Sequence, residues 1–256
     1  MKKIFLSILA IFVLTAVTTK AADDVSEYIV KADSLDKLFQ YEDALKVLEE
    51  ANQKFPNNWE VLWRMSRENV YIGNFLKDDD AREAQYVKAL GYAEQAVKLA
   101  PDQSVTYLRR AIANGKIALF KGVFSVGDLV NSVKADLEKA IELGNGGNYV
   151  QAIAHYVLGR THAKVSEKWK PARSVLGLGW ADLEIALKEY ATAEKLFPGF
   201  AMIHLDYAKA LMRDDKYKEA KAELEKVLAA KILDKEDPQR KEEAKELLKE
   251  VNEELE

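Results

Sequence analysis

The sequence predicts an all-α fold: a right-handed superhelical stack of about five helical hairpins, with helical insertions and a C-terminal capping helix. One observation is a small-residue spacing that recurs with the same stop signal. Three times an Ala is followed seven residues later by another Ala and five residues after that by a Pro. The triplets are Ala44, Ala51 and Pro56, then Ala89, Ala96 and Pro101, then Ala186, Ala193 and Pro198. An internal repeat of this kind is typical of stacked helical units.

The composition is the second observation. Hydrophobic residues make up 48% of the chain and charged residues 31%, whereas the 256 residues include only 12 Gly and 5 Pro. Ala, Leu, Glu and Lys, which favour helices, fill segments such as 41–54 and 216–228, with apolar residues three and four apart. No segment carries the alternating pattern of a strand, so we expect about two-thirds helix or more, well above the usual third.

The repeat spacing has a direct physical meaning. Two residues seven apart lie almost above one another on a helix, so Ala at both places lets a neighbouring helix approach closely. A Pro five residues further on ends the helix. Degenerate copies complete the series to five units, at Val133, Ala140 and Asn145 and at Ala220, Val227 and Ile232.

The first helix of each unit precedes its stop-bearing helix. We expect these first helices at 28–38, 59–72, 105–120, 149–165 and 201–212. Successive stops are separated by 45, 44, 53 and 34 residues. The surplus falls between the two helices of a unit, at 74–82, 122–127 and 166–180, where an insertion lengthens a hairpin tip and leaves the stack intact. The repeat domain thus spans 22–238, and a charged helix at 239–256 with an apolar stripe acts as its cap.

The beginning of the chain has the pattern of a secretory signal peptide. Lys2 and Lys3 precede an apolar stretch at 4–17, and Ala21 is the small residue at the end of the cleavage site that follows. We expect cleavage after residues 1–21, which moves the formal net charge from −4 to −7. The alternative is a retained anchor, although fourteen apolar residues are fewer than the roughly 20 of a spanning helix. The chain has no Cys, which excludes a lipoprotein anchor and disulfides, so we expect an exported, periplasmic protein without a stable membrane span.

The units resemble the tetratricopeptide repeat, whose period is about 34 residues. In the fourth unit the matching residues are Leu158, Gly159, Ala186, Tyr190, Ala193 and Pro198. In the fifth they are Tyr207, Ala208, Leu211 and Ala220. Two units depart from the pattern, because Asn145 stands where the third unit should have Pro and the fifth unit has no Pro at its stop.

A closer resemblance covers about the last 140 residues. Its motifs are Leu119-Phe120-Lys121-Gly122, Ala140-Ile141-Glu142-Leu143, His155 to Arg160, Trp169, Leu176-Gly177 and the stop from Ala193 to Phe200. In this order they are similar to the regulator of microtubule dynamics family. That resemblance implies a repeat stack with a helical insert in unit four and a closing helix, and it supplies no catalytic residues. A looser similarity is to the periplasmic helical-repeat components of tripartite solute transporters.

A concave groove is the first candidate site, because in such stacks the first helices line it. The frame of the repeat places on this face Trp63, Arg67 and Tyr71; Leu108, Ile112 and Lys116; Tyr156, Arg160 and Lys164; and Leu205, Lys209 and Arg213. A basic and aromatic groove in an acidic chain suits a carboxylate or an acidic peptide. The alternative is that the Lys and Arg are merely solvated and that Trp63 and Tyr156 fill gaps between hairpins.

The insert of unit four is the second candidate. Trp169 and Trp180 lie there with Lys170 and Arg173, and loops on a rigid scaffold often carry recognition. Packing as a capping segment is the alternative.

No pattern supports catalysis, a cofactor or a metal. His155 and His162 lack a third ligand at metal spacing, His204 stands alone, and three consecutive Asp at 78–80 lack the alternation of a calcium loop. The acidic charge argues against nucleic-acid binding. We therefore expect a non-enzymatic scaffold for a protein or peptide partner. The basic groove predicts that this partner is acidic. The alternative is a transporter-associated component that binds a small anionic ligand.

Overall fold

The computed structural model describes residues 24–121 and 126–256, so the expected signal peptide at 1–21 and most of the expected insertion at 122–127 lie outside it. The described residues form α-helices and no strand, which confirms the predicted all-α class. The helices are α1 (Val25–Lys37), α2 (Tyr41–Lys54), α3 (Trp59–Phe75), α4 (Asp79–Leu99), α5 (Ser104–Ala118), α6 (Val126–Leu143), α7 (Gly147–Ser166), α8 (Lys170–Val175), α9 (Leu183–Leu196), α10 (Ala201–Met212), α11 (Tyr217–Ala229) and α12 (Asp237–Glu254).

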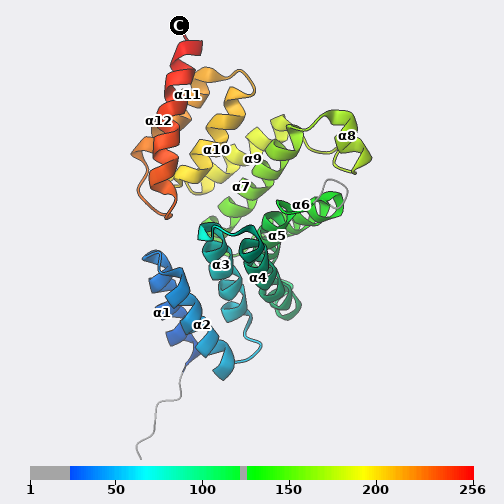
Figure 1. Cartoon of the computed structure of the whole chain (residues 1–256), viewed down its shortest axis with the longest axis vertical. Helices are drawn as coiled ribbons and strands as arrows, with labels where there is room; N and C mark the ends of the chain where they lie inside the picture. The colour runs from blue at the N-terminus through cyan, green and yellow to red at the C-terminus, as the bar shows by residue number, and fades with distance from the viewer. Residues whose placement is uncertain (1–23, 122–125) are drawn as a thin grey trace, which may run out of the picture.

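Five hairpins stack in chain order into the predicted superhelix (Figure 1). The pairs are α1 with α2, α3 with α4, α5 with α6, α7 with α9, and α10 with α11. The first helices also contact one another in the series α1, α3, α5, α7 and α10, and α12 continues this series by packing on both α10 and α11. The C-terminal helix therefore takes the place of a sixth first helix and belongs to the inner layer of the stack.

The repeated alanines lie in the seams between helices, as the spacing requires. Ala44, Ala89, Ala140 and Ala186 have 0% exposed surface, and their partners seven residues away are equally buried or nearly so. Gly159 shows how close the helices come, because a Cβ there would lie 3.1 Å from the carbonyl oxygen of Ala186. The Leu-Gly pair of the first helix thus lets α7 lie directly against α9.

The stop signals end the helices where the sequence places them. α2, α4 and α9 each end two residues before Pro56, Pro101 and Pro198. In unit three, Asn145 replaces the Pro and ties the end of the unit to its own beginning through its side chain. Its Oδ1 accepts from the backbone N–H of Ser104 at 2.8 Å, and its Nδ2 donates to the carbonyl of Asp102 at 2.7 Å. A stop that is hydrogen-bonded to the start of the same hairpin explains why unit three tolerates the loss of Pro.

The surplus residues extend the hairpins as expected. In unit two they lengthen α3 to 17 and α4 to 21 residues, with a tight connection in which Asp78 caps α4 by accepting from the N–H of Ala81 at 2.8 Å. In unit four they supply the short helix α8.

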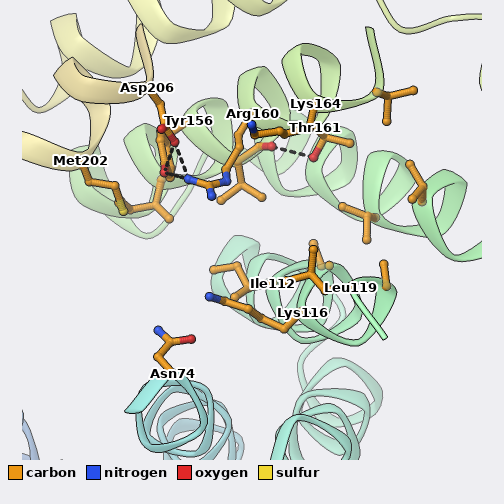
Figure 2. A pocket seen from close by; sticks show the side chains of 18 of the residues that line it. Asn74, Ile112, Lys116, Leu119, Tyr156, Arg160, Thr161, Lys164, Met202 and Asp206 are labelled. Carbon is orange, nitrogen blue, oxygen red and sulfur yellow. Dashed lines mark hydrogen bonds and ion pairs between the residues drawn. The ribbon is translucent and has the colours of Figure 1, made fainter. Parts of the chain in front are cut away.

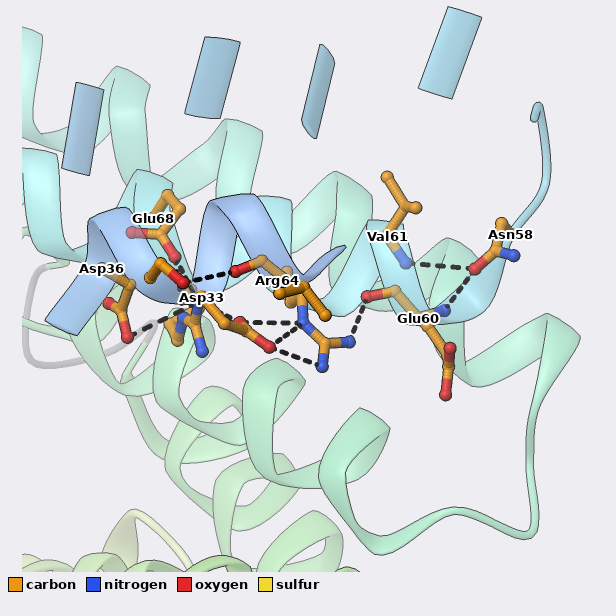
Figure 3. Close-up of polar contacts among 10 residues, drawn as sticks. Asp33, Asp36, Asn58, Glu60, Val61, Arg64 and Glu68 are labelled. Atoms are coloured by element: carbon orange, nitrogen blue, oxygen red, sulfur yellow. Dashed lines mark hydrogen bonds and ion pairs between the residues drawn. The ribbon is translucent and has the colours of Figure 1, made fainter. Parts of the chain in front are cut away.

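A buried charge network fastens α1 to α3 (Figure 3). Asp33 accepts from Arg64 Nη2 and Arg67 Nη2, both at 2.9 Å, and Glu68 Oε1 accepts from Arg67 Nε at 2.7 Å. Glu68 has no exposed surface, and its Oε2 has no hydrogen-bond partner among the described residues. Burial raises the pKa of this carboxyl from 4.5 to about 7, although Arg67 opposes the shift.

Replacing Glu68 with Gln is expected to stabilise the protein above neutral pH. The folded chain holds the Glu68 proton up to about pH 7 and the unfolded chain only to about 4.5, so the wild type loses stability as pH rises through this window. Thermal melts of Glu68→Gln should exceed those of the wild type at about pH 8 and converge with them near pH 4.5. The matched control is Glu225→Gln on the exposed face of α11, and an equal gain in that variant, or none in Glu68→Gln, contradicts the assignment.

Candidate functional site: the concave cavity

The inner layer of helices encloses a cavity of about 900 Å³, within the usual range for ligand sites. Side chains from α3, α5, α6, α7, α8, α10 and α12 line it. The cavity exists because the first helices pack side by side along a curve, so their inner faces converge and leave room between them. We call this space the concave cavity.

Positive charge dominates the lining of the concave cavity. Nine of its described side chains are Lys or Arg, and four are Asp or Glu. The cations are Arg109, Lys116, Lys121, Arg160, Lys164, Lys168, Arg173, Lys209 and Arg240. The carboxylates are Asp206, Asp234, Glu236 and Glu243. This local excess stands against a net charge of −4 for the whole chain and favours an anionic occupant.

Each of the four lining carboxylates already has a cationic partner. Asp206 accepts from Arg160 and from the hydroxyl of Tyr156 at 2.8 Å (Figure 2). Glu243 pairs with Lys209 at 2.6 Å. Asp234 and Glu236 both pair with Arg240, at 3.1 and 2.6 Å. The negative charges of the cavity are therefore neutralised from within.

Two cations of α5 lack such a partner. Arg109 is 5% exposed, and its Nε has no hydrogen-bond partner among the described residues. Lys116 lies two turns further along the same face. Its ammonium is 5.9 Å from the ring centre of Tyr86, and it makes no hydrogen bond or ion pair with any described residue. Burial, helped by repulsion from Arg160, lowers the pKa of the Lys116 ammonium from 10.5 to about 8. An anion bound beside Lys116 would compensate the desolvation of its ammonium and reduce its repulsion from Arg160.

The segment between α11 and α12 closes one side of the cavity. Lys235 places its ammonium 4.6 Å from the ring centre of Phe75 and 5.9 Å from that of Tyr41. The end of the stack thereby touches the second and third helices, far away in the sequence. Residues 231–236 are called the strap below.

The sequence matches the model of a known protein family. The family model for "RMD1-3: Regulator of microtubule dynamics protein 1-3" matches residues 28–252. The chain belongs to this family. No curated protein matches the sequence.

Solved structures show the same fold for this RMD1-3 family member. A thermophilic TPR protein, TTC0263 from Thermus thermophilus, is 18% identical with a TM-score of 0.63, covering 86% of this chain and 98% of its own. PilW, a type IV pilus biogenesis factor, is 16% identical with a TM-score of 0.53, covering 90% of this chain and 94% of its own. At these identities the likeness establishes the tetratricopeptide-like stack and nothing about a ligand.

Several residues placed on the groove by the repeat frame do line the cavity of this RMD1-3 family member. They are Tyr71, Ile112, Lys116, Tyr156, Arg160, Lys164, Leu205 and Lys209. Figure 2 shows Arg160 and Tyr156 on one side of the open space and Lys116 and Ile112 on the other. Their role in binding stays a prediction.

Four other residues lie elsewhere. Leu108 is in the core. Trp63 is half-buried in the seam, with the guanidinium groups of Arg64 and Arg109 4.1 and 5.5 Å from its ring centre. Arg67 belongs to the α1–α3 charge network. Arg213 ties α10 to the end of α7 by donating to the carbonyl of Ala163 at 2.9 Å. These side chains have structural partners because each faces a neighbouring helix.

The two tryptophans of the insert differ from one another. Trp180 is half-buried, donates its Nε1–H to Asn131 Oδ1 at 2.7 Å and meets the ring of His162 edge-on at 4.9 Å. Trp180 therefore packs against neighbouring side chains, which is the alternative given above for the insert. Trp169 precedes α8 and is 76% exposed. Partner binding through Trp169 stays a prediction.

Sequence reasoning missed Arg109 and the whole contribution of α12. Arg109 lies seven residues before Lys116, so the helical period alone could have placed it on the same face. The charged pattern of 239–256 predicts a terminal capping helix, and no local signal shows that this helix would bring Arg240 and Glu243 to the cavity.

His204 has partners that its isolation in the sequence conceals. Its Nδ1 meets Glu223 Oε2 at 2.7 Å, its Nε2 meets the carbonyl of Pro198 at 2.8 Å, and Glu194 completes a group with the spacing of metal ligands. The Lys226 ammonium bonds both carboxylates, at 2.7 Å for Glu223, so they already have a cationic partner.

None of the helices in the described part of the chain combines the length and the apolar character that crossing a bilayer requires.

Proposed function

We propose that this protein is a non-enzymatic scaffold that holds an acidic segment of a partner protein in its concave cavity. The observation that carries the proposal is the excess of cations over carboxylates in the lining, with Arg109 and Lys116 left unpaired. An acidic segment would supply the missing negative charge. Its carboxylates can accept forked hydrogen bonds from Arg and single ones from Lys.

The rigidity of the stack supports this role. Stacked hairpins hold the cavity open before the partner arrives, so little conformational entropy of the scaffold is lost on binding. The paired groups Arg160–Asp206 and Lys209–Glu243 fix neighbouring side chains in place. Specificity then comes from the charges that remain without a partner.

Selection from a phage-displayed library of random peptides on the purified protein tests the proposal. Asp and Glu are expected to be enriched among retained peptides, and free selected peptide should compete with the phage. Enrichment of basic or uncharged peptides instead contradicts the proposal. A parallel selection on the variant Lys116→Met identifies peptides held at other surfaces, since these are retained by both proteins.

A small anionic ligand is a second candidate, favoured by the strap. Asp234 and Glu236 of the strap line the cavity, and Lys235 between them holds the strap against Phe75 and Tyr41, an arrangement that suits a compact molecule better than a long chain. Such a protein would act as a transporter-associated component. Thermal melting with citrate, succinate and glutamate tests it, because a ligand of the folded state raises the melting temperature. No shift with any of these carboxylates argues against this candidate.

We further propose that the protein is exported to the cell envelope, in the periplasm, after removal of residues 1–21. The charged and apolar pattern of these residues supports export, and the chain contains no Cys for lipid attachment. The intact mass of the protein recovered from the envelope should correspond to a chain beginning at Ala22. A mass that includes Met1 contradicts cleavage.

A further inference from the structure

The lining of the concave cavity divides into two halves of different chemistry. One half lies between α6, α7 and α8 and contains most of the aliphatic lining, although Lys164, Lys168 and Arg173 of the same region also line the cavity. Its aliphatic side chains are Val126, Val130, Val133, Val157, Val165, Leu176 and Leu178. The other half lies between α7, α10 and α12 and carries Tyr156, Arg160, Asp206, Lys209 and Arg240. An occupant that fills the cavity therefore meets apolar side chains mainly at one end and paired charges at the other.

Lys116 lies on the wall that both halves share. It projects from α5, on which Ile112 also lines the cavity, and Leu119 follows directly after that helix. In Figure 2 its ammonium points into the space below Arg160, on the side away from Leu119 and beside Ile112. A carboxylate that pairs with Lys116 therefore lies near Ile112, and the following residues of a peptide can extend along α5 toward the aliphatic side chains.

Polar lining groups favour a peptide over a plain hydrocarbon chain. Asn74 and Gln239 bring amide groups to the cavity wall, whereas the hydroxyl of Thr161 already donates to the carbonyl of Val157 at 2.7 Å. Asn74 Oδ1 accepts from Tyr86 at 3.0 Å, which leaves its amide hydrogens as donors toward the cavity in Figure 2. A peptide backbone offers carbonyl and N–H groups to match such side chains, whereas a hydrocarbon would leave them without partners.

We propose that the concave cavity recognises a peptide segment in which an acidic residue is followed directly by large aliphatic residues. This inference rests on the proposed function and makes it specific. The carboxylate pairs with Lys116, and the Leu, Ile or Val side chains enter the aliphatic half between α6, α7 and α8. Burial of those side chains adds affinity.

An oriented peptide library tests the proposal on the full protein. Each peptide carries a fixed Asp-Glu pair followed by randomised positions, and a second library carries Asn-Gln in place of the pair. We expect the acidic library to be retained and Leu, Ile and Val to be enriched at the randomised positions. Free peptide of the enriched sequence should bind at least about tenfold more tightly than its Ser-substituted counterpart.

Two variants link the preference to the aliphatic half. Val130→Asp places a charge between α6 and α7 and is expected to remove the aliphatic enrichment while acidic peptides are still retained. Val87→Asp, on the exposed outer face of α4, is the matched control and should leave the enrichment unchanged. Leu176→Gln is the second test variant, in case Val130→Asp lowers the melting temperature.

The outcomes separate the two proposals. Retention of the acidic library with polar residues enriched overturns the present inference and leaves the proposed function standing. Equal retention of the acidic and neutral libraries overturns both. Aliphatic enrichment that survives in Val130→Asp and in Leu176→Gln also overturns the present inference, because it then arises at another surface.

Discussion

Replacing Lys116 with Met is expected to make the protein more stable and at the same time unable to hold acidic peptides. The methionine keeps the length of the side chain and removes the charge. Acidic peptides selected on the wild type should bind the variant at least about tenfold more weakly, since tenfold corresponds to about 1.4 kcal/mol, less than many charge-assisted contacts contribute. Fluorescence anisotropy with a labelled selected peptide measures this loss.

The gain in stability follows from the depressed pKa. The Lys116 ammonium has a pKa of about 8 in the folded protein and 10.5 when unperturbed. Below about pH 8 the folded protein therefore carries a charge that burial disfavours, and wild-type stability rises as pH increases from about 8 to 10.5. Lys116→Met has no buried charge at this position, so its stability should not rise with pH in this way. Its melting temperature at neutral pH should exceed that of the wild type by a few degrees, since about 1 kcal/mol shifts a protein of this size by about 2–4 °C.

Lys88 offers the matched control for this experiment. It is exposed on α4, away from the cavity, so Lys88→Met should change neither peptide affinity nor the pH dependence of melting. Unchanged affinity in Lys116→Met, or a lower melting temperature without any effect on binding, contradicts the role given to Lys116.

Replacing Ala186 with Leu is expected to be among the most destabilising single changes in the chain. Ala186 is fully buried in the seam where α9 meets Gly159 of α7. The larger side chain has no space to enter, so the two helices must separate. Overpacking of this kind costs about 1–3 kcal/mol, and we expect the upper end because Ala186 has 0% exposed surface in a seam that is already close at Gly159. The melting temperature should fall by about 6–12 °C.

Ala191 on the same helix is the control for Ala186. It is exposed, so Ala191→Leu adds the same atoms to the same helix without touching the seam. Circular dichroism melts should show little change for this variant. Similar melting temperatures for the two variants contradict close packing at the repeated alanines.

The repeat spacing was sufficient to predict the hairpins because it encodes local physics. An Ala pair seven residues apart needs a nearby helix, and a Pro ends the helix wherever it falls. The same local logic placed Tyr156, Arg160 and Lys209 on the inner face, where they line the cavity. Short-range patterns therefore determine both the units and the direction in which their side chains point.

The departures arise where long-range packing decides. Arg67 has the spacing of a groove residue, yet Asp33 and Asp36 of α1 engage it, at 2.9 and 3.6 Å. Its partners lie about one repeat away in sequence, and no periodic pattern identifies them. Likewise, α12 has the composition of an exposed cap but packs on α10, which brings Arg240 to the cavity. Such placements depend on the curvature of the whole stack.

Cross-linking of a selected acidic peptide tests most directly whether the concave cavity is the binding site. The peptide carries a benzophenone group beside its acidic residue, and mass spectrometry locates the modified residues after irradiation. We predict modification on the inner helices α5, α7 and α10, lost when unlabelled peptide is in excess. Modification confined to the outer helices α4, α9 and α11 would contradict the account.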